Sequence, residues 1–199
     1  MKSCNPPRST LRSSHPTSGW KRMRGKPMLS NVVLIGMPGS GKSTVGVILA
    51  KQTRRDFVDT DVMIQTLQER TLQDIVDREG PMALRSIEEG VLLGLSLRNH
   101  VIATGGSAVY SDRAMNHLRS DGIVVFLDAD LPTLEARVQD FGTRGLAKRP
   151  GQSFVELYEE RLPLYRKHAE ITVKCGVLTH EEVAAKVAGE LPAHRSGRE

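Results

Sequence analysis

The sequence predicts an α/β domain with three layers, in which helices cover both faces of a parallel sheet. Three observations predict this fold. Short apolar segments alternate with segments of helical periodicity, the first apolar segment is uninterrupted, and no hairpin signal joins two strands. The chain has 199 residues, of which 39% are hydrophobic and 26% charged. This is the composition of a globular domain, and it excludes a wholly disordered or fibrous chain.

The first half of the chain is expected to begin with a buried strand, a glycine loop and a helix. The strand contains the apolar, largely β-branched run Val32–Ile35, which is typical of a parallel sheet. Farther on, apolar residues recur at helical spacing and Gly80-Pro81 interrupts them, so at least two helices are expected. In order, the elements are a strand at Asn31–Ile35, a helix from about Lys42 to Gln52, a strand at Asp56–Asp59 and helices between Val62 and Arg98.

In the second half, two expected helices begin with capping-box sequences. Ser153 and Thr179 are each followed three residues later by a glutamate, which helps to satisfy the first amides of a helix. Pro132 suits the first turn of another helix. The elements are strands at His100–Thr104, Gly122–Leu127 and Ile171–Val173, and helices at Ser111–Arg119, Pro132–Gln139, Ser153–His168 and Thr179–Glu190.

Residues 1–27 form a basic leader that differs in composition from the rest. They hold seven lysines and arginines and no acid, since the first acidic residue is Asp56. With a net charge of +5 overall, residues 28–199 therefore carry −2. Such a segment has too little apolar surface to order itself. We expect a dispensable or spurious extension ahead of a domain at 28–199, with a transit peptide or a basic arm for an anionic partner as alternatives.

Composition also limits the compartment and the partners. Cys4 and Cys175 are too few for a disulfide framework or a zinc site, so a cytoplasmic protein is expected. No apolar run approaches the roughly 20 residues that cross a bilayer. Aromatic residues make up only 4%, which leaves few platforms for stacking nucleic-acid bases. Neither a membrane nor a nucleic acid is therefore expected as a partner.

A phosphate-binding loop follows the first strand. Gly36–Ser43 matches G-x-x-x-x-G-K-[ST] between a strand and a helix, which is the context that the motif requires. Amides of the glycine turn and of the helix N-terminus face an anion, Lys42 reaches the β- and γ-phosphates, and the Ser43 hydroxyl ligates Mg²⁺. The sequence therefore predicts a site for a nucleoside triphosphate, ATP, with Mg²⁺. Its residues are Gly36, Gly39, Ser40, Gly41, Lys42, Ser43 and Thr44.

Two carboxylates follow at the end of the second strand. Asp59 and Asp61 are two residues apart, so on a strand they share a face at the edge where ligands of open α/β folds bind. One can hold Mg²⁺ through water, and the other can accept a proton from an attacking hydroxyl or align it. The alternative is a solvated strand end in which Asp61 caps the next helix.

Four further motifs give the chain a specific resemblance. Phe57–Asp61 matches F-x-D-x-D, Leu84–Glu88 approximates F-R-x-x-E, Thr104–Ser107 approximates a glycine-rich loop, and Glu160–Tyr165 matches E-R-x-P-x-Y. With the phosphate-binding loop, this ordered set resembles the shikimate kinase family of P-loop kinases over about residues 32–173. The resemblance implies a five-stranded parallel sheet of order 2-3-1-4-5, and ATP-dependent phosphorylation of the 3-hydroxyl of shikimate.

The resemblance also implies a role for each site residue. Lys42 and Ser43 serve phosphate and Mg²⁺, and Asp59 lies in the outer shell of the metal. The acceptor is a small molecule with a carboxylate and hydroxyls, which suits the planar fork of arginine and the close approach of glycine backbone. Its residues are Asp61 at the hydroxyls, Arg85 and Arg161 at the carboxylate, and Gly105 and Gly106 near the ring.

Arg85 has an alternative role. Glu88 and Glu89 stand three and four residues after it, so it can simply pair along its own helix. Arg161 has no acid at these offsets, which makes a local ion pair a weaker explanation for its presence.

A mobile lid is expected at about 139–152, where three cations lie among glycines. Flexible cations suit a segment that closes over ATP, excludes water and neutralises phosphate charge during transfer. By resemblance, Arg144 reaches the phosphates and joins Lys42 and Asp61 as a catalytic residue, while Arg137 lies along adenine. The alternative is a solvated loop.

Three positions depart from the family pattern. Ser107 stands at the third position of a Gly-Gly-Gly loop, Leu84 replaces an aromatic residue, and residues 144–147 read Arg-Gly-Leu-Ala instead of Arg-Pro-Leu-Leu. All three lie on the acceptor side or in the lid, whereas the phosphate-binding loop is intact. The alternatives are therefore a kinase of another small hydroxylated acid such as gluconate, or a nucleotide-binding regulatory module without turnover. A monomer is expected.

Overall fold

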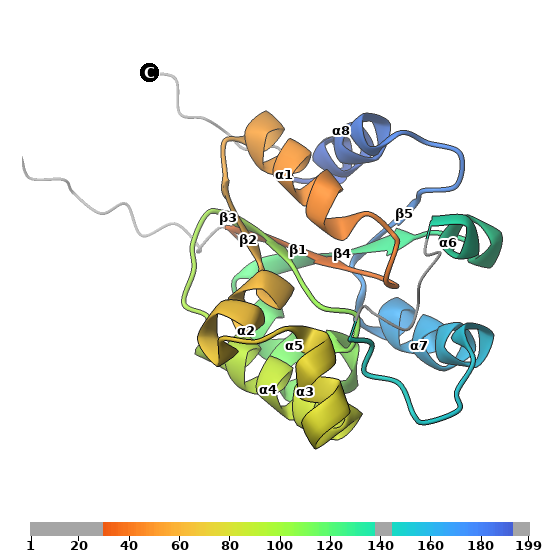
Figure 1. Cartoon of the computed structure of the whole chain (residues 1–199). Coiled ribbons are helices and arrows are strands. Elements are labelled where there is room, and N and C mark those ends of the chain that lie inside the picture. Colours follow the sequence, from red (N-terminus) through yellow and green to blue (C-terminus); the bar gives the residue numbers. More distant parts are fainter. Residues whose placement is uncertain (1–29, 138–144, 193–199) are drawn as a thin grey trace, which may run out of the picture.

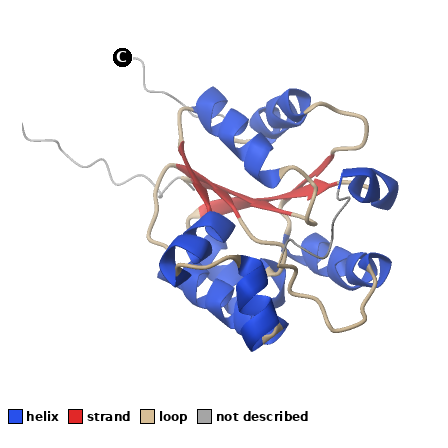
Figure 2. Ribbon diagram, in the orientation of Figure 1, coloured by secondary structure: helices blue, strands red, loops and turns tan. Residues whose placement is uncertain are grey.

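The computed structural model describes residues 30–137 and 145–192. The predicted leader, residues 1–27, and the predicted lid arginine, Arg144, lie outside the described residues. A central sheet is covered by helices on both faces, and Figure 2 shows the sheet as the middle layer. The predicted three-layer α/β fold is therefore confirmed.

Five strands form one parallel sheet. Across the sheet they lie in the order β2 (Asp56–Asp59), β3 (His100–Ala103), β1 (Asn31–Ile35), β4 (Gly122–Asp128) and β5 (Ile171–Lys174). In the centre, Val33 of β1 lies opposite Ile102 of β3 and Val124 of β4. Every residue of β1 is buried, because helices on both faces leave such a strand no polar side. The order 2-3-1-4-5 is confirmed.

Helices connect consecutive strands and cover the sheet. They are α1 (Lys42–Thr53), α2 (Thr60–Gln68), α3 (Leu72–Glu79), α4 (Pro81–Gly94), α5 (Asp112–Arg119), α6 (Leu131–Arg137), α7 (Phe154–His168), α8 (His180–Glu190) and the 3₁₀ turn η1 (Ala108–Tyr110). Helices α1 and α8 lie together on one face, and α4, α5 and α7 lie on the other (Figure 1). Within the described residues, no helix combines the length and apolarity needed to cross a bilayer.

The helical region after β2 divides into three helices. Gly80, with φ of +85°, ends α3 where the sequence predicts an interruption. A second break lies between α2 and α3, where Glu69 adopts φ of +52° and Thr71 begins a capping box with Asp74. The predicted capping boxes Ser153–Glu156 and Thr179–Glu182 are also present. The starts of α3, α7 and α8 are thus set by local hydrogen bonds to their first amides.

The parallel sheet places three loops at one edge. The phosphate-binding loop follows β1, Asp59 ends β2, and the Thr104–Ser107 segment follows β3. Because these strands are neighbours and run in the same direction, their carboxyl ends meet, which is where open α/β sheets bind ligands.

Candidate active site

A cavity of about 420 Å³ opens at this edge of the sheet. Most of the predicted site residues line it. The predicted residues among its lining are Gly39, Gly41, Lys42, Ser43, Thr44, Asp61, Gly106, Arg137 and Arg161. The other predicted residues that the structure describes are Gly36, Ser40, Asp59, Arg85 and Gly105, which lie next to the lining. The structure therefore gathers residues that are up to 125 positions apart in the chain.

Lys42 lies across the glycine turn at the start of α1. Its Nζ donates hydrogen bonds to the carbonyl oxygens of Gly36, at 2.8 Å, and Met37, at 2.9 Å. Burial lowers the pKa of Lys42 to about 8, and the carboxylates of Asp61 and Asp59 act in the opposite direction. The ammonium is thus held at the cavity in a partly desolvated state, where it interacts strongly with an anion.

The turn itself requires glycine at two positions. Gly36 has φ of +150°, and an added Cβ would lie 2.8 Å from the carbonyl oxygen of Leu127. Gly41 has φ of +91°, and a Cβ there would lie 3.0 Å from the ring of His180. Among the described residues, no side chain caps the first amides of α1, so these amides are available to an anion.

Ser43 and Asp59 form a pair of oxygen ligands beside this turn. The Ser43 hydroxyl donates to Asp59 Oδ2 at 2.6 Å, and Asp59 Oδ1 accepts from the amide of Asp61 at 2.9 Å. A hydroxyl and a carboxylate are the donor types that Mg²⁺ takes, with water completing its shell. The two residues therefore fit the predicted metal site.

The prediction that Asp59 and Asp61 share a strand face is wrong. The β2 ladder ends at Asp59, which pairs with Ala103, and Asp61 lies in the first turn of α2. The alternative also fails, because Asp59 rather than Asp61 caps the helix. This capping turns the chain so that Asp61 lines the cavity. Burial raises the pKa of Asp61 to about 6, while Lys42 opposes the shift.

Glu88 is a buried carboxylate of the cavity that the sequence analysis did not assign to the site. It is 3% exposed, lines the cavity from α4 and accepts a hydrogen bond from the Ser107 hydroxyl. Burial raises its pKa to about 7, and Asp61 raises it further. An added Cβ at Gly105 would collide with Glu88 Oε1 and lie 2.6 Å from Asp61 Oδ1. Gly105 therefore lies directly against two carboxylates.

Arg161 lines the cavity from α7 and is only 1% exposed. Its Nη2 donates to the carbonyl oxygen of Ala147 at 2.9 Å, and its Nε donates to the Tyr110 hydroxyl at 3.3 Å. An added Cβ at Gly106 would lie 2.8 Å from Arg161 Nη1, so the glycine allows the guanidinium to approach the backbone. Tyr165 holds Gly106 in turn, because its hydroxyl donates to the Gly106 carbonyl at 2.7 Å.

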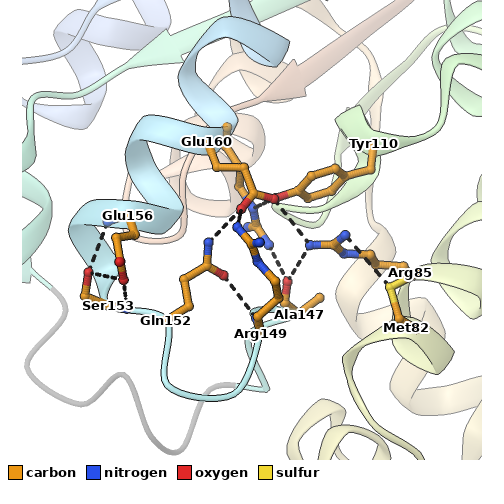
Figure 3. Close-up of polar contacts among 10 residues, drawn as sticks. Met82, Arg85, Tyr110, Ala147, Arg149, Gln152, Ser153, Glu156 and Glu160 are labelled. Atoms are coloured by element: carbon orange, nitrogen blue, oxygen red, sulfur yellow. Dashed lines mark hydrogen bonds and ion pairs between the residues drawn. The ribbon is translucent and has the colours of Figure 1, made fainter.

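Arg85 meets Arg161 at the same carbonyl but lies outside the lining of the main cavity. Its Nη2 donates to the Ala147 carbonyl at 3.2 Å, and its guanidinium lies 3.6 Å from the centre of the Tyr110 ring (Figure 3). Glu160 approaches the same Nη2 to 3.9 Å. Local pairing with Glu88 or Glu89 is not seen, since these carboxylates bond Ser107 and Ser111.

The described part of the predicted lid packs against α3 and α7. The amide of Gly145 donates to Gln73 Oε1 at 2.8 Å, and Ala147 is buried. Arg149 pairs with Glu160 at 2.6 Å, as Figure 3 shows, and Lys148 donates to the carbonyl of Gln152. These two cations are therefore held within the loop and by α7.

Two residues of the cavity were not assigned to the site from the sequence, and only one of them carries a signal there. Glu88 stands three residues after Arg85, a spacing that puts both on one side of α4. This spacing could have identified it. His180 also lines the cavity, but no pattern in the sequence indicates this. Only the packing of α8 beside α1 brings its ring to Gly41.

Comparisons with known proteins agree on one family. A model of the shikimate kinase family matches residues 38–192. The shikimate kinase of Thermodesulfovibrio yellowstonii is 35% identical over 173 residues, covering 85% of this chain and 99% of the relative. That of Paracidovorax citrulli is 40% identical over 156 residues, covering 76% and 84%. The structure of a shikimate kinase from Acinetobacter baumannii in complex with shikimate matches with a TM-score of 0.75 and 32% identity, covering 83% of this chain and 97% of that chain.

Proposed function

The chain belongs to the shikimate kinase family, and from this premise we propose that it transfers the γ-phosphoryl group of ATP to the 3-hydroxyl of shikimate. The hydroxyl oxygen forms a new bond to the γ-phosphorus while the bond to the β–γ bridging oxygen breaks. The products are ADP and shikimate 3-phosphate. Catalysis of such a transfer consists mainly of positioning the reactants and stabilising phosphate charge.

The phosphate-binding loop supplies the ATP side of the reaction. The uncapped amides of α1 and the Lys42 ammonium bind the β- and γ-phosphates, and Gly36, Gly39 and Gly41 let the backbone approach them. Arg137 lies beside the nucleotide. This assignment is supported by the position of Lys42. The residue lines the cavity, and two carbonyl oxygens hold its ammonium in place. Arg144 is proposed to reach the phosphates, although it lies outside the described residues.

Ser43 and Asp59 are the residues proposed to hold Mg²⁺. Their oxygens, 2.6 Å apart, suit a hard cation that keeps several waters. When bound, Mg²⁺ neutralises charge on the phosphate oxygens. Ser43 contributes its hydroxyl oxygen to this site. Asp59 contributes Oδ2, the carboxylate oxygen that accepts the hydrogen bond from Ser43 in the structure.

The acceptor side is built from a carboxylate and two guanidinium groups. Asp61 accepts the proton of the attacking hydroxyl and aligns that hydroxyl. Arg85 and Arg161 hold the acceptor carboxylate, and the Thr104–Ser107 segment, here called the acceptor loop, brings Gly105 and Gly106 close to the ring. The convergence of both arginines on one oxygen atom, the Ala147 carbonyl, supports this role. A carboxylate oxygen is the same type of hydrogen-bond acceptor with a stronger charge.

One observation carries the proposal beyond nucleotide binding. A single cavity is lined by Lys42 and Ser43 and also by Asp61 and Arg161. A phosphate donor and an acidic acceptor can therefore meet in it. A regulatory module that only binds ATP has no need of Asp61 and Arg161 there.

The test is an acceptor panel with purified protein. ADP release is measured with ATP, Mg²⁺ and either shikimate, gluconate or no acceptor, and ³¹P NMR identifies the phosphorylated position. We expect rapid ADP release with shikimate alone and a product phosphorylated at the 3-hydroxyl. Lys42→Ala is the inactive control, with a kcat lower by about 10² or more. Turnover of gluconate but not shikimate, or tight ATP binding without turnover, would contradict the proposal.

We also propose a monomeric, cytoplasmic enzyme. The low cysteine content supports the compartment. Sedimentation of the purified protein measures the oligomeric state directly.

A further inference from the structure

Ser107 is the last residue of the acceptor loop, and its hydroxyl contacts Glu88 Oε2 as a hydrogen-bond donor. Both side chains are buried, with 7% of Ser107 and 3% of Glu88 exposed. The backbone of Ser107 has φ of −99° and ψ of −1°, which lies in the bridge region that is allowed to L residues. The loop therefore places a side chain here without the positive φ that would require glycine.

This hydrogen bond lies in the wall between two cavities. Ser107 and Glu88 line both the main cavity and a neighbouring cavity of about 520 Å³. The neighbouring cavity is also lined by Arg85 and Tyr110. The pair thus stands between the phosphate-transfer site and the first of the two proposed carboxylate-binding arginines.

The same bond belongs to a row of contacts that joins α4 to the segment around η1. The Arg85 guanidinium lies over the Tyr110 ring at 3.6 Å, and Ser111 donates to Glu89 Oε1 at 2.9 Å. Of the three contacts in this row, the bond from Ser107 to Glu88 is the nearest in sequence to Gly105 and Gly106. It therefore connects α4 directly to the acceptor loop.

Glu88 depends strongly on the hydroxyl of Ser107. Its other oxygen, Oε1, has no hydrogen-bond partner among the described residues and lies against Gly105 beside Asp61. The charged groups that face Glu88 are Asp61 from α2, Lys42 from α1 and Arg161 from α7. A buried carboxylate that loses its hydrogen-bond donor pays the full cost of desolvation, so its surroundings shift or it takes up a proton.

We propose that Ser107 and Glu88 are a positioning pair for the acceptor, in which the serine hydroxyl holds the buried carboxylate and thereby fixes α4, with Arg85, against Gly105 and Gly106. This inference rests on the proposed function and deepens it. The pair acts on the acceptor through Arg85 and the loop backbone, and it leaves the phosphate-binding loop untouched.

The test compares Ser107→Ala in two backgrounds, the wild type and Glu88→Gln. In the wild-type background, the variant leaves a buried carboxylate without its donor, and we expect the KM for shikimate to rise about tenfold. The KM for ATP stays unchanged, because the phosphate-binding loop is not involved. In the Glu88→Gln background a neutral amide replaces the carboxylate, so Ser107→Ala changes the KM for shikimate by only about two- to threefold.

Ser86→Ala is the matched control, since it removes an exposed hydroxyl from the same helix, and we expect both KM values to stay at wild-type level. Thermal unfolding checks that each variant is folded. An unchanged KM for shikimate in Ser107→Ala, an equal effect in both backgrounds, or an equal rise in the KM for ATP would overturn the inference. A wild-type protein that does not phosphorylate shikimate would instead contradict the proposed function.

Discussion

At the cavity, buried cationic side chains interact with carboxylates. Lys42 and Arg161 interact electrostatically with Asp61 and Glu88. Burial lowers the pKa of the ammonium and raises the pKa of both carboxyls, so each charged form depends on an opposite charge nearby. Such groups respond strongly when an anionic substrate enters.

The raised pKa of Asp61 predicts how activity depends on pH. Because Asp61 acts as a base only when it is ionised, kcat/KM for shikimate is expected to fall as the pH decreases through about 6. Above that value the carboxylate is charged and the rate levels off. Asp61→Asn lowers kcat by about 10²–10⁴ and loses this acid limb.

Steady-state rates from pH 5 to 8 measure this dependence. The residual rate of Asp61→Asn over the same pH range, with MgATP at saturation, serves as the control. A wild-type profile that stays flat down to pH 5, or an acid limb that persists in Asp61→Asn, would refute the role of Asp61 as the base.

At the scale of elements, α7 carries much of the acceptor side. It places Arg161 in the cavity, and one turn later Tyr165 holds Gly106 and stacks on Phe126 with ring centres 5.1 Å apart. Its start is defined by the capping box in which the Glu156 amide donates to Ser153 Oγ at 3.2 Å. The cap therefore contributes to stability and determines where the helix begins.

Ser153→Ala is expected to destabilise the protein by about 1 kcal/mol, because the first amides of α7 lose their acceptor. For a domain of this size, the Tm then falls by about 2–4 °C. Ser153→Thr keeps a hydroxyl that can accept from the Glu156 amide and donate to the Glu156 carboxylate, and it is expected to retain the wild-type Tm, which thermal unfolding measures. Equal losses in both variants would show that the hydroxyl does not act as a cap.

Local patterns predicted most elements, and their limits explain the remaining differences. The runs of β1 and β2 and the boxes of Ser153 and Thr179 each contain their own signal within a few residues. The break before Thr71 has a weak signal in the sequence. Its capping box ends in Asp74, whereas the usual residue at that position is glutamate or glutamine. The 3₁₀ turn η1 carries no sequence pattern, and α4, α5 and α7 all pack against it.

For the whole molecule, the described strands form one parallel sheet, and most of the described site residues line the cavity at its carboxyl edge. The apolar interior is continuous from β1 and β4 to α1, α5, α7 and α8. A cavity built on such a rigid sheet keeps its reacting groups in place.

Removal of residues 1–27 is therefore expected to leave kcat/KM for shikimate within about twofold of the full chain, because the core and the site lie in the remaining domain. Kinetics and thermal unfolding of the two proteins test this expectation. The full-length chain is the control. A large loss of activity with an unchanged Tm would show that the leader takes part in catalysis. This result would contradict the expectation that the leader is dispensable.

The sequence by itself determined the phosphate-binding loop and the alternation of strands and helices, and it predicted nine of the residues that line the cavity. These depend on local spacing, such as that of Lys42 after its glycines. Only the tertiary structure decided that Asp61 enters the cavity from a helix, that Glu88 meets Ser107, and that His180 reaches Gly41. The physical reason is that these contacts join separate elements, and their partners become neighbours only when the sheet and its helices pack.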